Sequence, residues 1–179
     1  TDIDGEYEKS LLDEWCSLIL SEFTDGRIRG ILHTRNDRPA DAIIDEGTEI
    51  LYGTDYFYDE LLGLNFKVTP FSFFQTNSLG AEKLYETARE FITGNNLGEV
   101  FDLYSGTGTI AQVLSPSAIH VTGVEIVEEA VEAARENAEL NNLTNCDFIA
   151  GDVFKVLESL DTVPDTIVLD PPRDGVSPK

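Results

Sequence analysis

Basic residues are scarce in this sequence of 179 residues. Lysine and arginine number 12 against 34 aspartates and glutamates, which gives a formal net charge of -22. An acidic surface repels polyanions, so non-specific adhesion to nucleic acid or anionic lipid is disfavoured, and any nucleic acid must be bound locally. Because so many carboxylates repel one another at low salt, we expect a halophile-like acidic surface and a high-salt source.

Cysteine is also rare, and long apolar runs are lacking. Cys16 and Cys146 are too few for a disulfide framework or for a metal site built from cysteines, so we expect reduced thiols and no metal. No apolar run reaches the roughly 20 residues that cross a bilayer, and no signal-peptide pattern opens the chain. We therefore expect a cytoplasmic protein without a membrane partner.

The chain opens with Thr1 rather than methionine and ends in a stretch typical of a loop, so we expect an internal part of a longer protein. Residues 1–66 predict a small antiparallel β module. Its short strands, at 27–33, 48–53 and 56–58, are separated by turn signals. Residues 7–23 have apolar spacing that fits either a helix or a strand.

Residues 67–179 predict an α/β domain. A helix is expected from Ser78 to about Gly94, with an apolar stripe made of Leu79, Leu84, Ala88, Phe91 and Ile92. Strands are expected at 100–103, 120–125, 146–149 and 166–169, and they alternate with helices that end near 114, 140 and 160. This alternation predicts a parallel sheet with ligands at the carboxyl ends of its strands.

A glycine loop at residues 101–111 joins the first parallel strand to its helix. Gly106 and Gly108 allow close approach of backbone to ligand, although a tight turn without ligand is also possible. The pattern also fits a dinucleotide site, which makes an NAD(P)-binding oxidoreductase an alternative function. Asp102 would repel a pyrophosphate bound there but would tolerate S-adenosylmethionine, which carries a sulfonium and an ammonium.

Other polar residues follow the remaining strands or precede the long helix. Glu125 can accept ribose hydroxyl hydrogens or cap a helix, and Asp152 can contact adenine or cap a helix. Asp170 is held at the fourth strand end by the prolines that follow, and it could instead cap a turn. Gln75 can present a donor and an acceptor to a planar ligand, although its phenylalanine neighbours are most often core residues.

Three segments, at residues 73–77, 102–109 and 170–175, together resemble the RNA uracil-C5 methyltransferases. These enzymes use S-adenosylmethionine to form 5-methyluridine in tRNA or ribosomal RNA. The resemblance implies a Rossmann-like class I methyltransferase fold, of which this chain holds the first four parallel strands. The stretch before residue 67 is similar to the family's central module, and a non-catalytic RNA-binding protein remains an alternative.

The resemblance also implies roles for single residues. Cofactor contacts are implied for Gln75, Tyr104, Gly106, Gly108, Thr109, Glu125, Asp152 and Asp170. Contacts with the flipped uracil or the RNA are implied for Phe73, Gln75, Asp170 and Arg173. Within the first set, Glu125 would bind ribose, Asp152 would lie by the adenine, and Asp170 would lie between the methionyl group and uracil.

The family's catalytic residues are expected outside this chain. A cysteine thiolate adds to C6 of uracil in the family, and a glutamate base removes the C5 proton. Both are expected beyond Lys179, so we predict no catalytic residue here and little cofactor binding by this part alone. Cys16 and Cys146 fit better as small buried side chains than as nucleophiles.

The basic residues concentrate between residues 27 and 38. Arg27, Arg29, Arg35 and Arg38, with His33 among them, could contact phosphates or could lie on the solvent face of a strand. Neither tRNA nor ribosomal RNA is favoured as the partner by the sequence.

Overall fold

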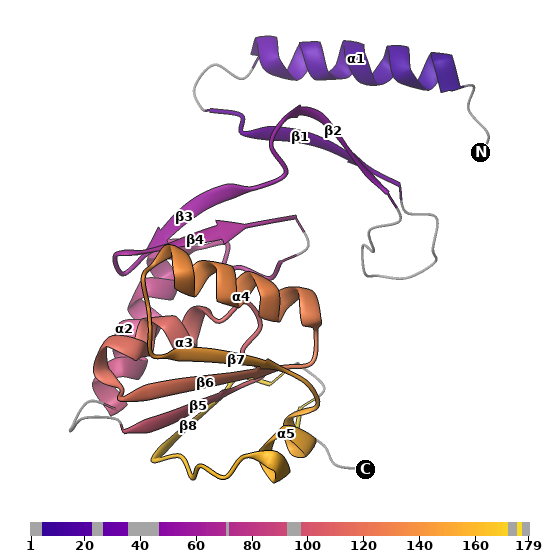
Figure 1. Cartoon of the computed structure of the whole chain (residues 1–179). Helices are drawn as coiled ribbons and strands as arrows, with labels where there is room; N and C mark the ends of the chain where they lie inside the picture. The colour runs from indigo at the N-terminus through magenta and orange to yellow at the C-terminus, as the bar shows by residue number, and fades with distance from the viewer. Residues whose placement is uncertain are drawn as a thin grey trace. The chain divides into compact units, whose positions relative to one another are not determined.

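The computed structural model describes residues 5–22, 27–35, 47–70, 72–92, 98–171 and 175–176. The chain forms two compact units (Figure 1). One comprises Thr1–Phe57 with Val68–Phe71, and the other comprises Tyr58–Lys67 with Ser72–Lys179. The domain boundary expected at residue 66 stays a prediction.

The first unit contains one helix and one antiparallel strand pair. Residues 7–23, whose apolar spacing fits either a helix or a strand, lie almost entirely within helix α1 (Gly5–Glu22). Strands β1 (Gly30–Thr34) and β2 (Thr48–Gly53) pair with a bulge between Ile31 and Leu32, and α1 packs on β2. The predicted strand at 27–33 therefore begins three residues later than expected.

The second unit is built on a four-stranded parallel sheet. Its strands are β5 (Glu99–Leu103), β6 (His120–Glu125), β7 (Cys146–Ala150) and β8 (Thr166–Leu169). They lie in the order β7-β6-β5-β8, and every pair is parallel. The predicted α/β class with a parallel sheet is confirmed.

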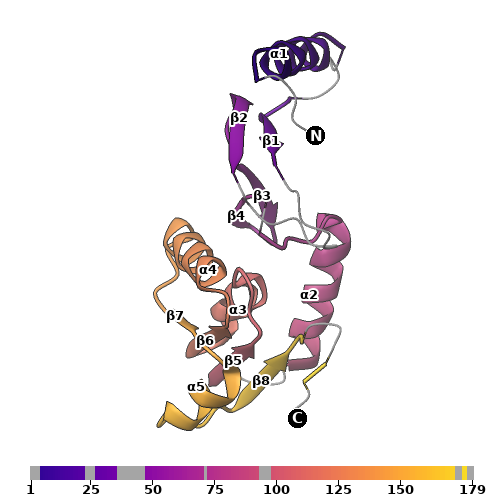
Figure 2. The ribbon, with the colours of Figure 1, turned by 90° about the vertical axis from the view of Figure 1, so that its right-hand side faces the viewer.

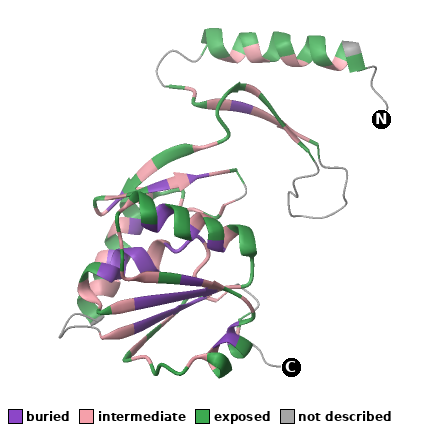
Figure 3. Ribbon diagram, viewed as in Figure 1, coloured by how far each residue is buried: buried purple, intermediate pink, exposed green. Residues whose placement is uncertain are grey.

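Helices cover both faces of this sheet, which explains why its central strands β5 and β6 are buried along nearly their whole length. On one face, α3 (Thr109–Leu114) and α4 (Glu128–Leu140) pack on buried residues such as Val100 and Val121. On the other face, α5 (Val153–Ser159) packs on Phe101 and Val124 (Figure 2). The burial of β5 and β6 is visible in Figure 3. A short 3-10 turn, Ser115–Ser117, follows α3.

Helix α2 (Ser78–Ile92) confirms the predicted helix but not its predicted apolar face. Leu79, Leu84 and Phe91 are exposed by 77%, 59% and 86%. The buried face instead carries Ala81 and Tyr85, which pack with residues of β3, β4 and α3. The expectation was wrong because the tertiary partner, and not side-chain size, decides which face of a helix is buried.

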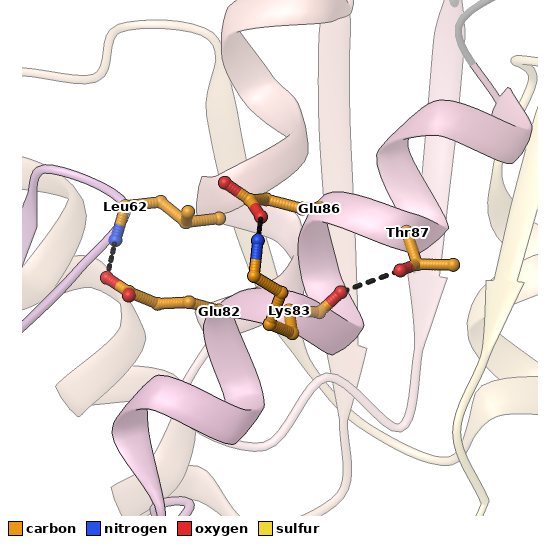
Figure 4. Close-up of polar contacts among 5 residues, drawn as sticks. All are labelled: Leu62, Glu82, Lys83, Glu86 and Thr87. Carbon is orange, nitrogen blue, oxygen red and sulfur yellow. Dashed lines mark hydrogen bonds and ion pairs between the residues drawn. The ribbon is translucent and has the colours of Figure 1, made fainter.

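Strands β3 (Phe57–Leu61) and β4 (Leu64–Val68) form a hairpin that packs against α2 and α3. Its two-residue turn places Leu62 at φ 51° and Gly63 at φ 80°, as a type I′ turn requires. Glu82 of α2 accepts a hydrogen bond from the Leu62 amide at 2.9 Å (Figure 4). The helix thereby satisfies a donor that the tight turn leaves without a strand partner.

Asn137 of α4 and Asn141, the residue that follows α4, hydrogen-bond to the edge of β4. Asn137 Oδ1 accepts from the Lys67 amide at 2.8 Å, and Asn141 bonds both the amide and the carbonyl of Asn65 at 2.8 and 2.9 Å. Asn137 and Asn141 are four residues apart, which is about 6.0 Å along a helix, and Asn65 and Lys67 are two residues apart, which is about 6.6 Å along a strand. The asparagine side chains therefore match the spacing of the strand amides. Side-chain amides of a helix therefore replace a neighbouring strand.

Replacing Asn141 with leucine should destabilise this unit by about 2 kcal/mol, because it removes two hydrogen bonds to the backbone of Asn65 and one to the side chain of Gln112. Urea denaturation measures the loss, and hydrogen exchange at the Asn65 amide should accelerate. Glu132→Gln, at an exposed position of the same helix, is the control. Unchanged exchange at Asn65 would contradict the docking role of Asn141.

Candidate functional site

A cavity of about 440 Å³ lies at the carboxyl ends of β5 and β8. Strand β5 has β6 on one side and β8 on the other, so the chain order reverses at β5, and such switch points bind ligands in open α/β sheets. The lining residues are Phe73, Phe74, Gln75, Tyr85, Asp102, Tyr104, Ser105, Gly106, Thr107, Thr109, Ile110, Asp170 and Pro171.

The glycine loop is held in an unusual backbone conformation. Tyr104 has φ 66°, a left-handed value that is uncommon for a residue with a side chain and is often found at functional sites. The amides of Tyr104 and Ser105 both donate to the Val124 carbonyl, at 2.9 and 3.0 Å, which fixes the loop against β6. The loop therefore turns sharply at the end of β5 and begins α3.

The two glycines of the loop differ in what surrounds them. Gly106 has φ 53°, and a Cβ there would meet nothing within 4 Å. Gly108 has φ 73°, but a Cβ there would lie 2.5 Å from Phe148 and 2.9 Å from Ala134. Gly106 thus keeps space open beside the cavity, while Gly108 allows the loop to pack on the sheet and α4.

Asp102 lines the cavity and is 1% exposed. Its Oδ2 accepts a hydrogen bond from the Ala111 amide of α3 at 3.0 Å, while its buried Oδ1 has no hydrogen-bond partner. Its pKa is raised to about 7, mainly by burial; the Ala111 bond opposes this shift, and the charges of Asp170 and Glu125 add to it.

A second polar atom beside the cavity is also left without a partner. Ser105 Oγ is buried and makes no hydrogen bond. Buried polar groups are nearly always hydrogen-bonded, so two orphaned oxygens at one cavity indicate a polar ligand. Asp170, at the end of β8, adds an exposed carboxylate to the same lining. None of the lining residues described by the structure is a lysine or arginine.

The segment before α2 brings aromatic and amide groups to the cavity. Phe74 packs on Phe66 with ring centroids 5.9 Å apart, so this ring belongs to the core. Phe73 is 77% exposed although it lines the cavity, which leaves its face free to stack on a ligand. Gln75 is half-buried and lies in the same lining as Tyr85.

Glu125 and Asp152 are not among the lining residues. Glu125 accepts hydrogen bonds from the amides of Gly106, Ile126 and Val127, at 3.0, 2.8 and 3.0 Å. Asp152 caps α5 by accepting from Phe154 and Lys155. The capping alternative is therefore present for Asp152, whereas Glu125 bonds amides that precede α4, and no side chain caps that helix. The ligand roles of both residues stay proposals.

Several expected groups lie elsewhere in the chain. Arg173 and Arg38 fall outside the described residues. Arg35 is paired with Glu8 at 2.7 Å, whereas Arg27 and Arg29 are exposed. The expectation of phosphate contacts from this group stays a prediction.

Neither cysteine shows the features of a nucleophile. Burial raises the pKa of the Cys146 thiol to about 11, so it is protonated at neutral pH, and it does not line the cavity. Cys16 is half-buried on α1. Among the described residues, no group of histidine, cysteine and acidic side chains could hold a metal ion. No helix in the described part of the chain is long and apolar enough to span a membrane.

Sequence reasoning missed Tyr85, Ser105 and Thr107 as members of the lining. Tyr85 lies four residues after Ala81, so helical spacing could have placed both on the same face of α2, the helix that follows Gln75 in the chain. Ser105 and Thr107 stand between the predicted glycine-loop residues, and Thr107 Oγ1 contacts the Phe73 carbonyl at 3.5 Å.

The known proteins that are similar to this chain are methyltransferases. Residues 95–174 match a family described as a methyltransferase domain. A curated relative from Clostridium tetani, named as an uncharacterized RNA methyltransferase, is 56% identical over 168 residues, or 94% of this chain and 37% of that protein. A relative of the same description from Caldanaerobacter subterraneus is 53% identical over 96% of this chain and 38% of its own length. The chain therefore spans little more than a third of these relatives.

Solved structures agree on the fold. The tRNA (uracil-54, C5)-methyltransferase of Pyrococcus abyssi, in complex with S-adenosyl-L-homocysteine, superposes with a TM-score of 0.68 at 30% identity. The match covers 86% of this chain and 37% of that one. Trm5b of Pyrococcus abyssi has a TM-score of 0.62 at 17% identity, over 97% and 49% of the two chains, and supports the fold alone. The fold of this chain is the Rossmann-like α/β fold of methyltransferases.

Proposed function

We propose that the protein transfers a methyl group from S-adenosylmethionine to C5 of a uridine in RNA. The curated relatives that are 53% and 56% identical are named RNA methyltransferases, and the Pyrococcus abyssi neighbour, at 30% identity, is a uracil-C5 enzyme. The observation that carries the proposal is the cavity at the β5 switch point, lined by acids and by an open glycine.

The residues present fit S-adenosylmethionine. Its methionine part carries a sulfonium and an ammonium, which are cations, and the cavity offers the free Oδ1 of Asp102 and the carboxylate of Asp170. The space above Gly106 lets the backbone come close to the ligand. A dinucleotide would place its negative pyrophosphate beside the same carboxylates, so the oxidoreductase alternative is disfavoured.

Further contacts follow from the loop and strand ends. Tyr104 and Thr109 line the cavity on either side of Gly106. Glu125 has three acceptor positions in use, and a carboxylate offers about four, so one remains for a ribose hydroxyl. Asp152 keeps its proposed place near the adenine. When bound, the cofactor supplies an electrophilic methyl group on a positively charged sulfur.

The uridine has to leave its base stack to reach this cavity, at a cost of a few kcal/mol. The exposed ring of Phe73 supports a role as the surface that receives the flipped base. Gln75 and Asp170 lie in the same lining and can meet the polar edge of the base. We propose that Arg27, Arg29 and Arg173 contact the phosphates of tRNA or ribosomal RNA.

Methylation at C5 also needs a nucleophile that adds to C6 of uracil. The protonated thiol of Cys146 does not supply it. We therefore propose that a cysteine beyond Lys179 is the nucleophile and that a glutamate there is the base.

The test is to incubate the full-length protein with methyl-labelled S-adenosylmethionine and unmodified transcripts of tRNA and of ribosomal RNA. Digestion to nucleosides and mass spectrometry should find the label in 5-methyluridine. The label in another nucleoside would refute the C5 assignment. Transfer to one transcript alone would identify the RNA class.

A further inference from the structure

Helix α1 carries a stripe of large apolar side chains that are exposed. Tyr7, Leu11, Trp15 and Leu18 recur at the three- and four-residue spacing that places side chains on one face of a helix. Their exposed fractions are 62%, 43%, 52% and 56%. Apolar side chains scattered singly over a surface are normal, whereas a contiguous row of large ones marks an interaction site.

Strand β2 does not account for this stripe. The partly buried side chains of α1 are Glu8, Leu12, Cys16 and Ile19, each of which follows a stripe residue by one position and so lies about 100° further around the helix. Helix α1 packs on β2, yet none of its described side chains is buried (Figure 3). The helix therefore has two adjacent faces with apolar side chains, and only one of them is partly covered.

The first unit needs a further apolar contact. Among its described apolar residues only Ile31 and Val68 are buried. Helices in proteins gain most of their stability from the tertiary packing of an apolar face, and a two-stranded sheet offers little core to pack on. We therefore expect the stripe of α1 to be covered in the whole protein.

The charge around the stripe limits what can cover it. Helix α1 contains five acidic residues and one lysine. Glu14 lies beside the stripe, three residues after Leu11, and Glu22 continues it, four residues after Leu18; both are exposed. RNA, or a second copy of this chain with its formal charge of -22, would bring more negative charge to these acids. The complementary partner is a protein surface with an apolar centre and a basic rim.

Most of the full-length protein lies outside the region that could supply its own partner here. This chain spans 37% and 38% of its relatives from Clostridium tetani and Caldanaerobacter subterraneus. RNA binding requires clustered lysines and arginines, and this chain holds only 12 against 34 acidic residues. The remaining part of an RNA methyltransferase of this kind is therefore expected to be basic.

We propose that the stripe of α1 is the docking face for an apolar, basic-rimmed surface in the part of the full-length protein outside these 179 residues. The basic character of that surface rests on the proposed function, since RNA binding is what requires it. The need for an apolar cover rests on the exposure of α1 alone.

Photo-crosslinking in the full-length protein identifies what covers the stripe. Trp15→benzoylphenylalanine should crosslink, with or without RNA, to a peptide of the same polypeptide outside these 179 residues in which lysine and arginine outnumber aspartate and glutamate. Asp13→benzoylphenylalanine is the control, because Asp13 is exposed on the opposite side of the same helix, and it should not crosslink to that peptide.

Crosslinks from position 15 only to a second copy, only to RNA or only to residues of this chain would overturn the proposal. Crosslinks to an outside peptide without an excess of basic residues, or no crosslink at all, would also overturn it. A full-length protein that gives the expected crosslink but does not methylate RNA would refute the proposed function and leave the docking face in place.

Thermal unfolding of the full-length protein is an independent test. Leu11→Gln should lower the Tm by about 3 °C or more, because it places a polar amide in a contact that is apolar in the whole protein. Leu20→Gln is the matched control, because Leu20 lies on the opposite side of α1 and is 38% exposed against 43% for Leu11. Its Tm should change by less than about 1 °C, as expected for a surface position. Equal shifts for the two variants would overturn the proposal.

Discussion

Asp102→Asn should make the protein more stable at pH 8, by about 4 kcal/mol at most. The pKa of Asp102 rises from 3.8 to about 7 in the folded protein because the side chain is buried. Above pH 7 the folded state therefore contains a buried carboxylate whose second oxygen has no partner. Asparagine removes that charge and keeps an oxygen that can accept the Ala111 hydrogen bond.

The pH dependence has a definite sign. Between pH 4 and pH 7 the folded state holds a proton that the unfolded state has released, so Asp102 lowers stability progressively as the pH rises through this range. Above pH 7 both states are ionised, and the cost stays constant. The stability difference between Asp102→Asn and wild type should therefore grow by roughly 3 kcal/mol from pH 5 to pH 8.

Urea denaturation of both proteins across this range measures the difference. Asp152→Asn is the matched control because Asp152 is an exposed helix cap and asparagine caps equally well. Its difference from wild type should stay near zero at every pH. If Asp102→Asn is no more stable than wild type at pH 8, the predicted cost of the buried Asp102 charge is refuted.

Substitution by alanine should mainly affect stability at Gly108 and mainly affect ligand binding at Gly106. Gly108→Ala places a Cβ against Phe148 and Ala134, in a left-handed conformation, and should destabilise the fold by about 3 kcal/mol or more. Gly106→Ala should lower the free energy of unfolding by only about 1 kcal/mol, the cost of a left-handed backbone, because its Cβ meets open space. That space borders the cavity, so the affinity for S-adenosylhomocysteine should fall about tenfold.

Thermal unfolding and calorimetric titration of the two variants separate these effects. The expected pattern is a folded Gly106→Ala protein with weak binding and a destabilised Gly108→Ala protein. A Gly106→Ala protein with wild-type affinity would show that the ligand does not approach this loop.

Much of the second unit follows from local sequence. Short stretches rich in β-branched and apolar residues alternate with helical segments at the spacing of βαβ units, so the parallel sheet was predictable. The glycine loop was predictable because positive φ angles favour glycine. Strand β4 was not predicted, although the alternation of Leu64, Phe66 and Val68 is typical of a strand. Some of its backbone hydrogen bonds are made by Asn137 and Asn141, which lie about 70 residues further along the chain.

The site was predictable where strand ends define it and less so elsewhere. Asp102 and Asp170 end neighbouring parallel strands, and such ends meet at one edge of a sheet. Tyr85 was not predicted because its burial depends on the hairpin that packs on α2. The partners of Glu125 were equally hidden, since the loop amide of Gly106 reaches it only in the folded chain.

The most direct measurement is calorimetric titration of the full-length protein with S-adenosylhomocysteine and, separately, with NAD. The acid-lined cavity at the ends of β5 and β8 predicts one bound S-adenosylhomocysteine per chain and no heat from NAD. Binding of NAD without binding of S-adenosylhomocysteine would contradict the account.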